Sequence, residues 1–293
     1  MTGVPDLSVL IVNWRSGAMT RALLPNLRGQ QFEGEEGGQG SIEFIIVDNA
    51  SGPNEEEHLA ALENQDDVTL IRSAQNSGYA VGMNMACERA RGRYVLVINP
   101  DVMAFRGCLA ALFNHLRQEE QCGMVGPRGF LDPSRFFQLP PVELPSLWSL
   151  KSEGAARVIP AWGRWHARQR TRRALDAWTA TGPREVSMLS GFCFLMDRDL
   201  AQLLGPFDPG YPFYFEDADL SMRLRRRGFT CVQVPRAEMV HFYNRSAGQD
   251  EQAALARYAV SRRRFYRQRY GALGAIAYNL TRFVVGRLKK ERV

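Results

Sequence analysis

The stretch Tyr94-Val95-Leu96-Val97-Ile98-Asn99-Pro100-Asp101 joins an apolar run to an amide, a proline and a carboxylate. A short apolar run that is rich in β-branched residues and bounded by proline is typical of a buried strand. Ser8 to Val12, Glu43 to Val47 and Val68 to Ile71 have the same character, and helix-compatible segments separate them. Strands that alternate with helices predict an α/β fold with a mainly parallel central sheet flanked by helices.

The helices expected between these strands span Thr20 to Leu27, Glu55 to Glu63 and Tyr79 to Ala90. An Arg/Trp-rich stretch from about 157 to 178 reads as a further helix, which forms either a lid or a surface element. The pattern then predicts a strand at Val186 to Met196 and a helix that starts near Glu216. A strand at Cys231 to Val234 and a basic helix at about Gln252 to Tyr270 are expected after them.

The composition is that of a folded globular protein. Of the 293 residues, 45% are apolar and 23% are charged, so the chain can bury a sizeable core. The net charge of +6 is concentrated between Arg157 and Arg173 and between Arg257 and Arg269. Nucleic acid, an anionic membrane and a phosphorylated substrate would all be attracted to such patches, so charge alone does not choose among them.

The cysteines indicate a reducing compartment. There are five, an odd number, without a C-x-x-C pair, which argues against a disulfide framework and against a zinc site. Residues 1–5 lead directly into strand-like sequence, so we expect no signal peptide, and no apolar stretch of about eighteen residues occurs. We therefore expect a cytoplasmic protein. Contact with the inner face of the cell membrane is compatible with this location.

Polar side chains follow several of the expected strands. Asn13 ends the first strand, Asp48 ends the second, and Asn99 and Asp101 follow the strand at 94–98. Ligands of open parallel sheets bind at the carboxyl ends of the strands, so these residues are candidates for a binding site.

Two of these segments have structural alternatives. Asp48 is placed to bind a ribose or base, but Asp48-Asn49-Ala50-Ser51 also forms turns and caps well. The glycines of the segment from Asn76 to Asn84 could let a ligand approach the backbone at a helix start, or could let that helix pack closely on the sheet.

The acidic candidates also have alternatives. Asp101 could hold a divalent cation, or could cap a helix that starts near Phe105. His241, one of four histidines, could complete the coordination of that metal, although a lone histidine is usually structural. Glu216 and Asp217 suit the first turn of a helix, and one of them could act as a general base.

The apolar tail from 272 to 285 is too short to span a bilayer. It predicts either an interfacial helix or a helix that packs on the body of the protein. It is followed by basic residues, namely Arg287, Lys289, Lys290 and Arg292.

Taken in this order, the segments resemble glycosyltransferase family 2, specifically its bacterial rhamnosyltransferase-like branch, which builds surface polysaccharides. The likeness covers roughly Ser8 to Tyr270. Its most specific pieces are Val-Asp-Asn-x-Ser at 47–51, Asn76 through Asn84, Asn99-Pro100-Asp101, Ser190-Gly191, Glu216-Asp217-x-Asp219-Leu220 and His241.

The resemblance implies a GT-A-type nucleotide-diphospho-sugar transferase fold over residues 1–250. Its nucleotide-binding half would span about 1–120 and its acceptor half about 121–250, with basic and amphipathic C-terminal helices at 251–293. The donor-binding residues would be Asn13, Asp48, Asn76, Gly78, Asn84 and Asn99. Asp101 and His241 would bind Mg²⁺ or Mn²⁺, Gly191 would line the acceptor side, Asp217 would be the base, and Glu216 would support it or contact the acceptor.

The reaction implied is an inverting, metal-dependent transfer of a sugar from a nucleotide diphosphate donor to a saccharide or lipid-linked saccharide. The usual D-x-D motif is here Asn99-Pro100-Asp101, which lowers the expected metal affinity; the same variant in the rhamnosyltransferase-like branch favours dTDP-rhamnose as donor. We expect peripheral membrane contact and no nucleic acid partner, because the basic patch at Arg262–Arg264 is small for a groove reader. The alternative is a non-catalytic nucleotide-sugar or polysaccharide-binding protein of the same fold.

Overall fold

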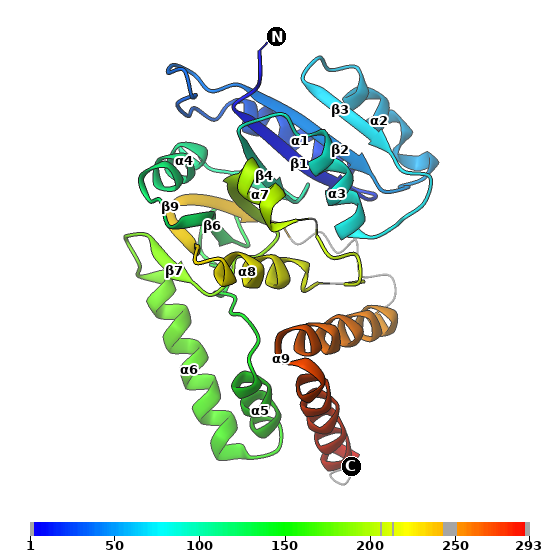
Figure 1. Cartoon of the computed structure of the whole chain (residues 1–293), viewed down its shortest axis with the longest axis vertical. Coiled ribbons are helices and arrows are strands. Elements are labelled where there is room, and N and C mark those ends of the chain that lie inside the picture. Colours follow the sequence, from blue (N-terminus) through cyan, green and yellow to red (C-terminus); the bar gives the residue numbers. More distant parts are fainter. Residues whose placement is uncertain (1–2, 206, 213, 243–250, 291–293) are drawn as a thin grey trace.

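The computed structural model describes residues 3–205, 207–212, 214–242 and 251–290, without the side chains of 251–254 and 284–290. These residues form one nine-stranded sheet with the strand order β3-β2-β1-β4-β8-β6-β9-β5, and β7 pairs with β9 (Figure 1). The α/β class and the central sheet flanked by helices are confirmed.

The first half of the sheet is entirely parallel. Its strands are β1 (Leu7–Asn13), β2 (Ile42–Asp48), β3 (Val68–Arg72) and β4 (Tyr94–Ile98). The helical segments between them are α1 (Gly17–Arg28), η1 (Pro53–Glu55), α2 (Glu56–Glu63) and α3 (Tyr79–Arg89). The elements predicted for this half are confirmed, with ends shifted by a few residues.

The side chains of β1 alternate between the two faces of the sheet, and this explains why helices cover both faces. Leu7, Val9 and Ile11 pack in the cluster that holds the apolar faces of α1 and α4 (Cys108–Gln118). Leu10 and Val12 pack in the opposite cluster, which holds α3. Because successive side chains of a strand point to opposite faces, this central strand has apolar residues at consecutive positions and is buried on both sides.

The second half of the sheet is mixed. It contains β5 (Val102–Ala104), β6 (Cys122–Phe130), β7 (Arg184–Val186), β8 (Cys193–Asp197) and β9 (Thr230–His241), with helices α7 (Arg198–Leu204) and α8 (Glu216–Arg226). Strand β8 is antiparallel to both β4 and β6, and β6 is parallel to β9. Strands β4, β6 and β9 therefore all end at one edge of the sheet.

The single strand expected from Val186 to Met196 is wrong. The segment divides into β7 and β8, and residues 187–192 between them form a bend and a turn. Met188 and Leu189 are buried without belonging to a strand. The apolar pattern thus predicts burial correctly, but these buried residues do not form the interstrand hydrogen bonds of a sheet.

Three helices pack beside the sheet domain: α5 (Leu147–Ala156), α6 (Pro160–Trp178) and α9 (Glu251–Lys290). Helix α5 contacts both α6 and α9, and Figure 1 shows the three at the end of the molecule away from β3. Helix α9 is broken at Gly271, whose φ of 65° departs from helical geometry. The expected domain bounds at 250 and 251 stay a prediction.

The two halves of α9 differ in exposure. Before the break, Phe265 and Tyr266 are fully buried, and Arg264 donates to both carboxylate oxygens of Asp208 at 3.0 and 2.8 Å. After the break, Ala275 and Tyr278 are buried. The exposed apolar side chains of this half are Leu273, Ile276, Leu280 and Phe283. One face of the tail therefore packs on the protein and another faces outward.

The predicted basic end of the tail, Arg287, Lys289, Lys290 and Arg292, lies outside the described side chains. No helix in the part of the chain that the structure describes combines the length and apolarity that a membrane span requires.

We predict that Gly82→Leu destabilises the fold by about 1–3 kcal/mol, the usual cost of overpacking a tight interface. A Cβ atom at Gly82 would lie 3.1 Å from both methyl carbons of Val12, so α3 would have to move away from β1. Urea unfolding measures the loss. Gly182→Leu is the control because a Cβ there meets nothing within 4 Å, and equal unfolding curves for the two variants would contradict the prediction.

Candidate active site

A buried polar network joins the carboxyl ends of β1 and β2. Asn13 donates through Nδ2 to Asp48 Oδ1 at 2.9 Å, and its Oδ1 accepts from Ser16 and Thr20 at 3.0 Å each. Asp48 also accepts from the hydroxyl and the backbone N–H of Ser51. The turn-forming role of Asp48 is therefore confirmed. Its donor-binding role, like that of Asn13, stays a prediction.

The loop before α3 is fastened to this network through Asn49, which sequence reasoning did not select. Asn49 Nδ2 donates to Asn76 Oδ1 at 3.0 Å, and Asn49 Oδ1 accepts from the backbone N–H of Ser77 at 3.0 Å. Asn76 Oδ1 also accepts from the Gly78 N–H. Gly78 has a φ of 88°, a conformation that favours glycine, and ends the loop at the start of α3.

Asn84 lies further along α3 and faces a different segment. Its carboxamide donates to the carbonyl of Phe207 at 2.8 Å and accepts from the N–H of the same residue at 2.7 Å. Both polar ends of the side chain are thus used to hold the loop that leads to α8. Its expected contact with the donor stays a prediction, and the structure gives it a positioning contact instead.

Asp101 and His241 meet at the edge of the sheet, where β5 pairs with the end of β9. Asp101 Oδ1 lies 3.3 Å from His241 Nε2, and Asn99 Nδ2 lies 3.4 Å from the same nitrogen. Asp101 does not cap the following helix, because β5 intervenes and Gly107 precedes α4. The helix-capping alternative for Asp101 is therefore wrong.

This pair fits a divalent cation. Two ligands that bind one Mg²⁺ at about 2.1 Å and at right angles lie about 3 Å from each other, close to the observed oxygen–nitrogen separation. No group of three or more His, Cys, Asp or Glu side chains poised for a metal occurs within the described residues. The pair would thus need oxygens from a substrate or from water to complete the coordination.

Glu216 and Asp217 begin α8. Asp217 Oδ2 accepts from the backbone N–H of Gly191 at 2.9 Å, and its Oδ1 accepts from the N–H of Ala218 at 2.7 Å. A carboxylate has about four lone-pair sites, so both oxygens keep capacity for a further proton or hydrogen bond. Asp219, next along the helix, instead forms an ion pair with Arg223 at 2.8 Å. The helix-dipole interpretation suits Asp219, whereas Asp217 is held toward another segment.

The backbone just before this acidic pair is strained. Tyr214 and Phe215 have φ values of 59° and 76°, in a region that residues with side chains seldom adopt. The Phe215 ring lies 5.3 Å from the ring of Tyr258 and 5.5 Å from that of Phe265, both on α9. Such strain persists where surrounding contacts enforce it, and it is frequent at functional sites. Helix α9 therefore supports the start of α8.

The acidic pair holds its protons unusually tightly. Burial raises the pKa of Glu216 to about 8, and the neighbouring charge on Asp217 adds to the increase. Burial also raises the pKa of Asp217, although its backbone hydrogen bonds, including the one from Gly191, oppose the shift. A carboxylate whose pKa approaches neutrality is a stronger proton acceptor than one of ordinary pKa.

The turn at 187–192 connects the two parts of the site. Gly191 contacts Asp217, and the next residue, Phe192, stacks its ring on His241 at 5.2 Å and 14°. The Tyr79 hydroxyl donates to the Gly191 carbonyl at 3.4 Å, and burial raises the Tyr79 pKa well above its usual value, which keeps that proton in place. Sequence reasoning did not select these two residues, although Tyr79 lies within the Asn76–Asn84 segment and Phe192 directly follows Ser190-Gly191.

Comparison with known proteins places the chain among sugar-transferring enzymes. The family model described as Glycosyl transferase family 2 matches residues 8–204. The chain is 30% identical over 228 residues to N-acetylglucosaminyl-diphospho-decaprenol L-rhamnosyltransferase of Mycobacterium tuberculosis, covering 73% of this chain and 71% of that one. It is 22% identical over 244 residues to the low-salt glycan biosynthesis hexosyltransferase Agl10 of Haloferax volcanii, covering 82% and 68%.

Solved structures share the fold. A mannosyltransferase of Pyrobaculum calidifontis in complex with GDP-Man and Mn²⁺ matches with a TM-score of 0.58 and 18% identity, covering 91% of this chain and 64% of that one. GalNAc-T7 with UDP, GalNAc and Mn²⁺ matches with a TM-score of 0.60 and 14% identity, covering 97% and 55%. The expected GT-A-type fold is confirmed by these neighbours.

We predict that Glu216→Gln changes the pH dependence of stability. The folded-state pKa of Glu216 is raised from 4.5 to about 8, so its stabilising contribution is complete below about 4.5 and is lost as pH rises through about 8. The variant should match the wild type at about pH 5 and be more stable at about pH 9.

Urea unfolding at both pH values measures this effect. Glu120→Gln, which changes an exposed glutamate in the turn after α4, is the control and should follow the wild type throughout. A stability difference between Glu216→Gln and the wild type that stays constant with pH would contradict the shifted pKa.

Proposed function

The chain belongs to glycosyl transferase family 2, and from this premise we propose that it transfers a sugar from a nucleoside diphosphate donor to an acceptor hydroxyl, with inversion. One observation carries the proposal. A single turn holds Gly191 against Asp217 and Phe192 against His241, so a candidate base and a candidate metal pair are fixed by neighbouring residues. A base that takes the acceptor proton and a metal that neutralises the leaving diphosphate both assist direct displacement.

Asp217 is the proposed general base. As the acceptor oxygen bonds to the anomeric carbon, its proton passes to an Asp217 oxygen, and the nucleoside diphosphate leaves with the bonding electrons. The Gly191 and Ala218 N–H groups hold the carboxylate in a fixed orientation while this occurs. Glu216, whose pKa burial raises to about 8, contacts the acceptor or supports the base. One displacement inverts the anomeric carbon, and no separate nucleophile is required.

Asp101 and His241 are the proposed metal ligands, with Asn99 beside them. The ion, when bound, neutralises charge on the diphosphate. The presence of Mn²⁺ in the mannosyltransferase and GalNAc-T7 structures supports a divalent cation, Mg²⁺ or Mn²⁺. Phe192, stacked on His241, restrains the imidazole so that its Nε2 faces Asp101.

The donor and acceptor are proposed from the relatives. The L-rhamnosyltransferase of M. tuberculosis supports rhamnose as the sugar transferred and an N-acetylglucosaminyl diphospholipid as the class of acceptor. The Asn99-Pro100-Asp101 variant of the motif favours dTDP-rhamnose as the donor of that sugar. The donor nucleoside would lie at the ends of β1 and β2, where Asn13, Asp48 and the Asn76–Gly78 loop form one network. Surface polysaccharide synthesis in the cytoplasm, next to the inner membrane face, is the corresponding process.

A peripheral membrane contact is part of the proposal. The outer face of α9 exposes Leu273 and Ile276 at 76% and 60%. The arginine-rich helix α6 lies at the same end of the molecule, with α5 between α6 and α9 (Figure 1). Apolar and cationic side chains at one end of a protein are suited to the interface of an anionic bilayer. Such contact would keep the enzyme beside a lipid-linked acceptor.

We predict metal-dependent release of nucleoside diphosphate from dTDP-rhamnose in the presence of acceptor. Asp101→Ala should lower it by roughly 10–100-fold or more, because it removes a proposed metal ligand. Asp66→Ala, at an exposed turn, is the matched control. A clear preference for a uridine or guanosine diphosphate sugar would overturn the donor assignment.

In the same assay, Asp217→Asn should reduce kcat by roughly 10²–10⁴-fold and leave nucleotide affinity unchanged, as loss of a general base does. Unchanged turnover would remove Asp217 from that role. Nucleotide-sugar binding by calorimetry without transfer to any acceptor would favour the alternative, a non-catalytic binding protein of the same fold.

We also predict that the protein floats with phosphatidylglycerol vesicles in a density gradient. Replacing Leu273, Ile276 and Leu280 together by serine should reduce the bound fraction about tenfold or more, because three apolar side chains no longer enter the interface. Leu203→Ser, at an exposed leucine of α7, is the control. Equal flotation of the triple variant and the wild type would exclude α9 as the contact.

A further inference from the structure

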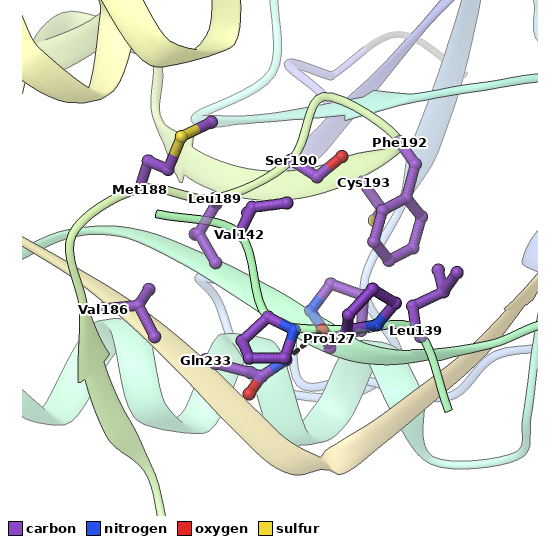
Figure 2. A pocket seen from close by; sticks show the side chains of 13 residues that line it. Pro127, Leu139, Val142, Val186, Met188, Leu189, Ser190, Phe192, Cys193 and Gln233 are labelled. Carbon is purple, nitrogen blue, oxygen red and sulfur yellow. Dashed lines mark hydrogen bonds between the residues drawn. The ribbon is translucent and has the colours of Figure 1, made fainter. Parts of the chain in front are cut away.

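A cavity of about 100 Å³ lies between the segment 139–142 and the part of the sheet formed by β6, β8 and β9. Figure 2 shows Val142 and Leu189 on one side of it and Phe192 and Leu139 on the other. Val142 is 40% exposed, so the cavity reaches the surface along this segment, whereas Leu189 and Phe192 are buried. None of the residues that line it, all of them in the described part of the chain, is charged.

The cavity adjoins the proposed site of chemistry. Ser190 and Phe192 line it, and Gly191 between them donates its N–H to Asp217. The residue of the turn that contacts the proposed base is therefore flanked on both sides by residues that line the cavity. An acceptor whose hydroxyl reaches Asp217 could direct a neighbouring substituent past the turn and into the cavity.

Size and chemistry limit what this substituent can be. An apolar cavity of about 150 Å³ binds benzene, so one of about 100 Å³ holds roughly four non-hydrogen atoms. A prenyl chain is too long for it, and a phosphate would find no cation in the lining. The walls are mostly apolar, with the Ser190 hydroxyl and the Gln233 carboxamide as polar groups. A short group with a methyl end and an amide fits this combination.

We propose that the cavity is a specificity pocket for the acetamido group of a 2-acetamido sugar in the acceptor. The methyl would lie among Leu139, Leu189 and Phe192, and the amide would face Ser190 or Gln233. The inference rests on the proposed function, because it requires that Asp217 receive the acceptor proton. It assigns recognition of the acceptor to a pocket that is separate from the donor-binding strand ends.

The test compares synthetic acceptors, glycosyl diphosphates on a short alkyl chain, that differ only at C2 of the sugar. We expect kcat/KM for the acetamido compound to exceed that of the C2-hydroxyl compound by roughly tenfold to a hundredfold, the usual range for one small substituent in an apolar pocket. The butanoylamido compound should react more slowly than the acetamido compound because the cavity cannot hold the longer chain. Equal kcat/KM for the acetamido and hydroxyl compounds would overturn the proposal.

Val142→Phe supplies the matching change in the protein. The larger ring should fill the cavity and reduce the preference for acetamido to within about threefold. Leu131→Phe, at a nearby exposed leucine that does not line the cavity, should retain the full preference. An unchanged preference in Val142→Phe would also overturn the proposal.

Binding without turnover separates this inference from the proposed function. In saturation-transfer NMR with methyl 2-acetamido-2-deoxyglucoside, the acetyl methyl should receive the strongest transfer from the wild type and lose it in Val142→Phe. Transfer that is equally strong in both proteins would reject the pocket, whatever the transferase assays give. If the wild type instead shows the methyl signal but no metal-dependent release of nucleotide, the proposed reaction is rejected and the pocket assignment stands.

Discussion

The hydrogen bond from the Gly191 N–H to Asp217 is the contact on which the candidate site depends. It joins two segments that are 26 residues apart, the turn before β8 and the first turn of α8. The same turn carries the Phe192 ring against the His241 ring, so neighbouring residues of one turn contact both the acidic pair and the metal pair. Packing and hydrogen bonds that lock the rotamers of site residues hold a site in its productive geometry.

The first half of the fold could be predicted because its signals are local. Each strand there is an apolar run of a few residues, and each helix carries its own apolar face, so the sequence of one element is enough to identify it. The turn at 187–192 could not be predicted in the same way. Met188 and Leu189 are as buried as strand residues, and the turn is held by distant partners such as Asp217 and Ser221.

In the candidate site too, local sequence predicts the positions of some residues and not of others. The positions of Asp101 and Asp48 followed from the rule that strand ends meet at one edge, and both lie there. The contact of Asn84 with Phe207 joins residues 123 positions apart, and no local pattern signals it. The ring of Phe192 on His241 is another such contact. Long-range contacts of this kind depend on the whole fold, which a motif does not contain.

The ring contacts of Phe215 with α9 matter when a gene fragment is interpreted. The family match ends at residue 204, and every residue that we assign to the chemistry lies before residue 242. A coding sequence truncated after codon 250 would still encode all of them and would still match the family. Its product would lack Tyr258 and Phe265, and with them the two ring contacts that support the left-handed backbone at Phe215. A complete set of motifs in such a fragment would therefore not amount to a complete enzyme.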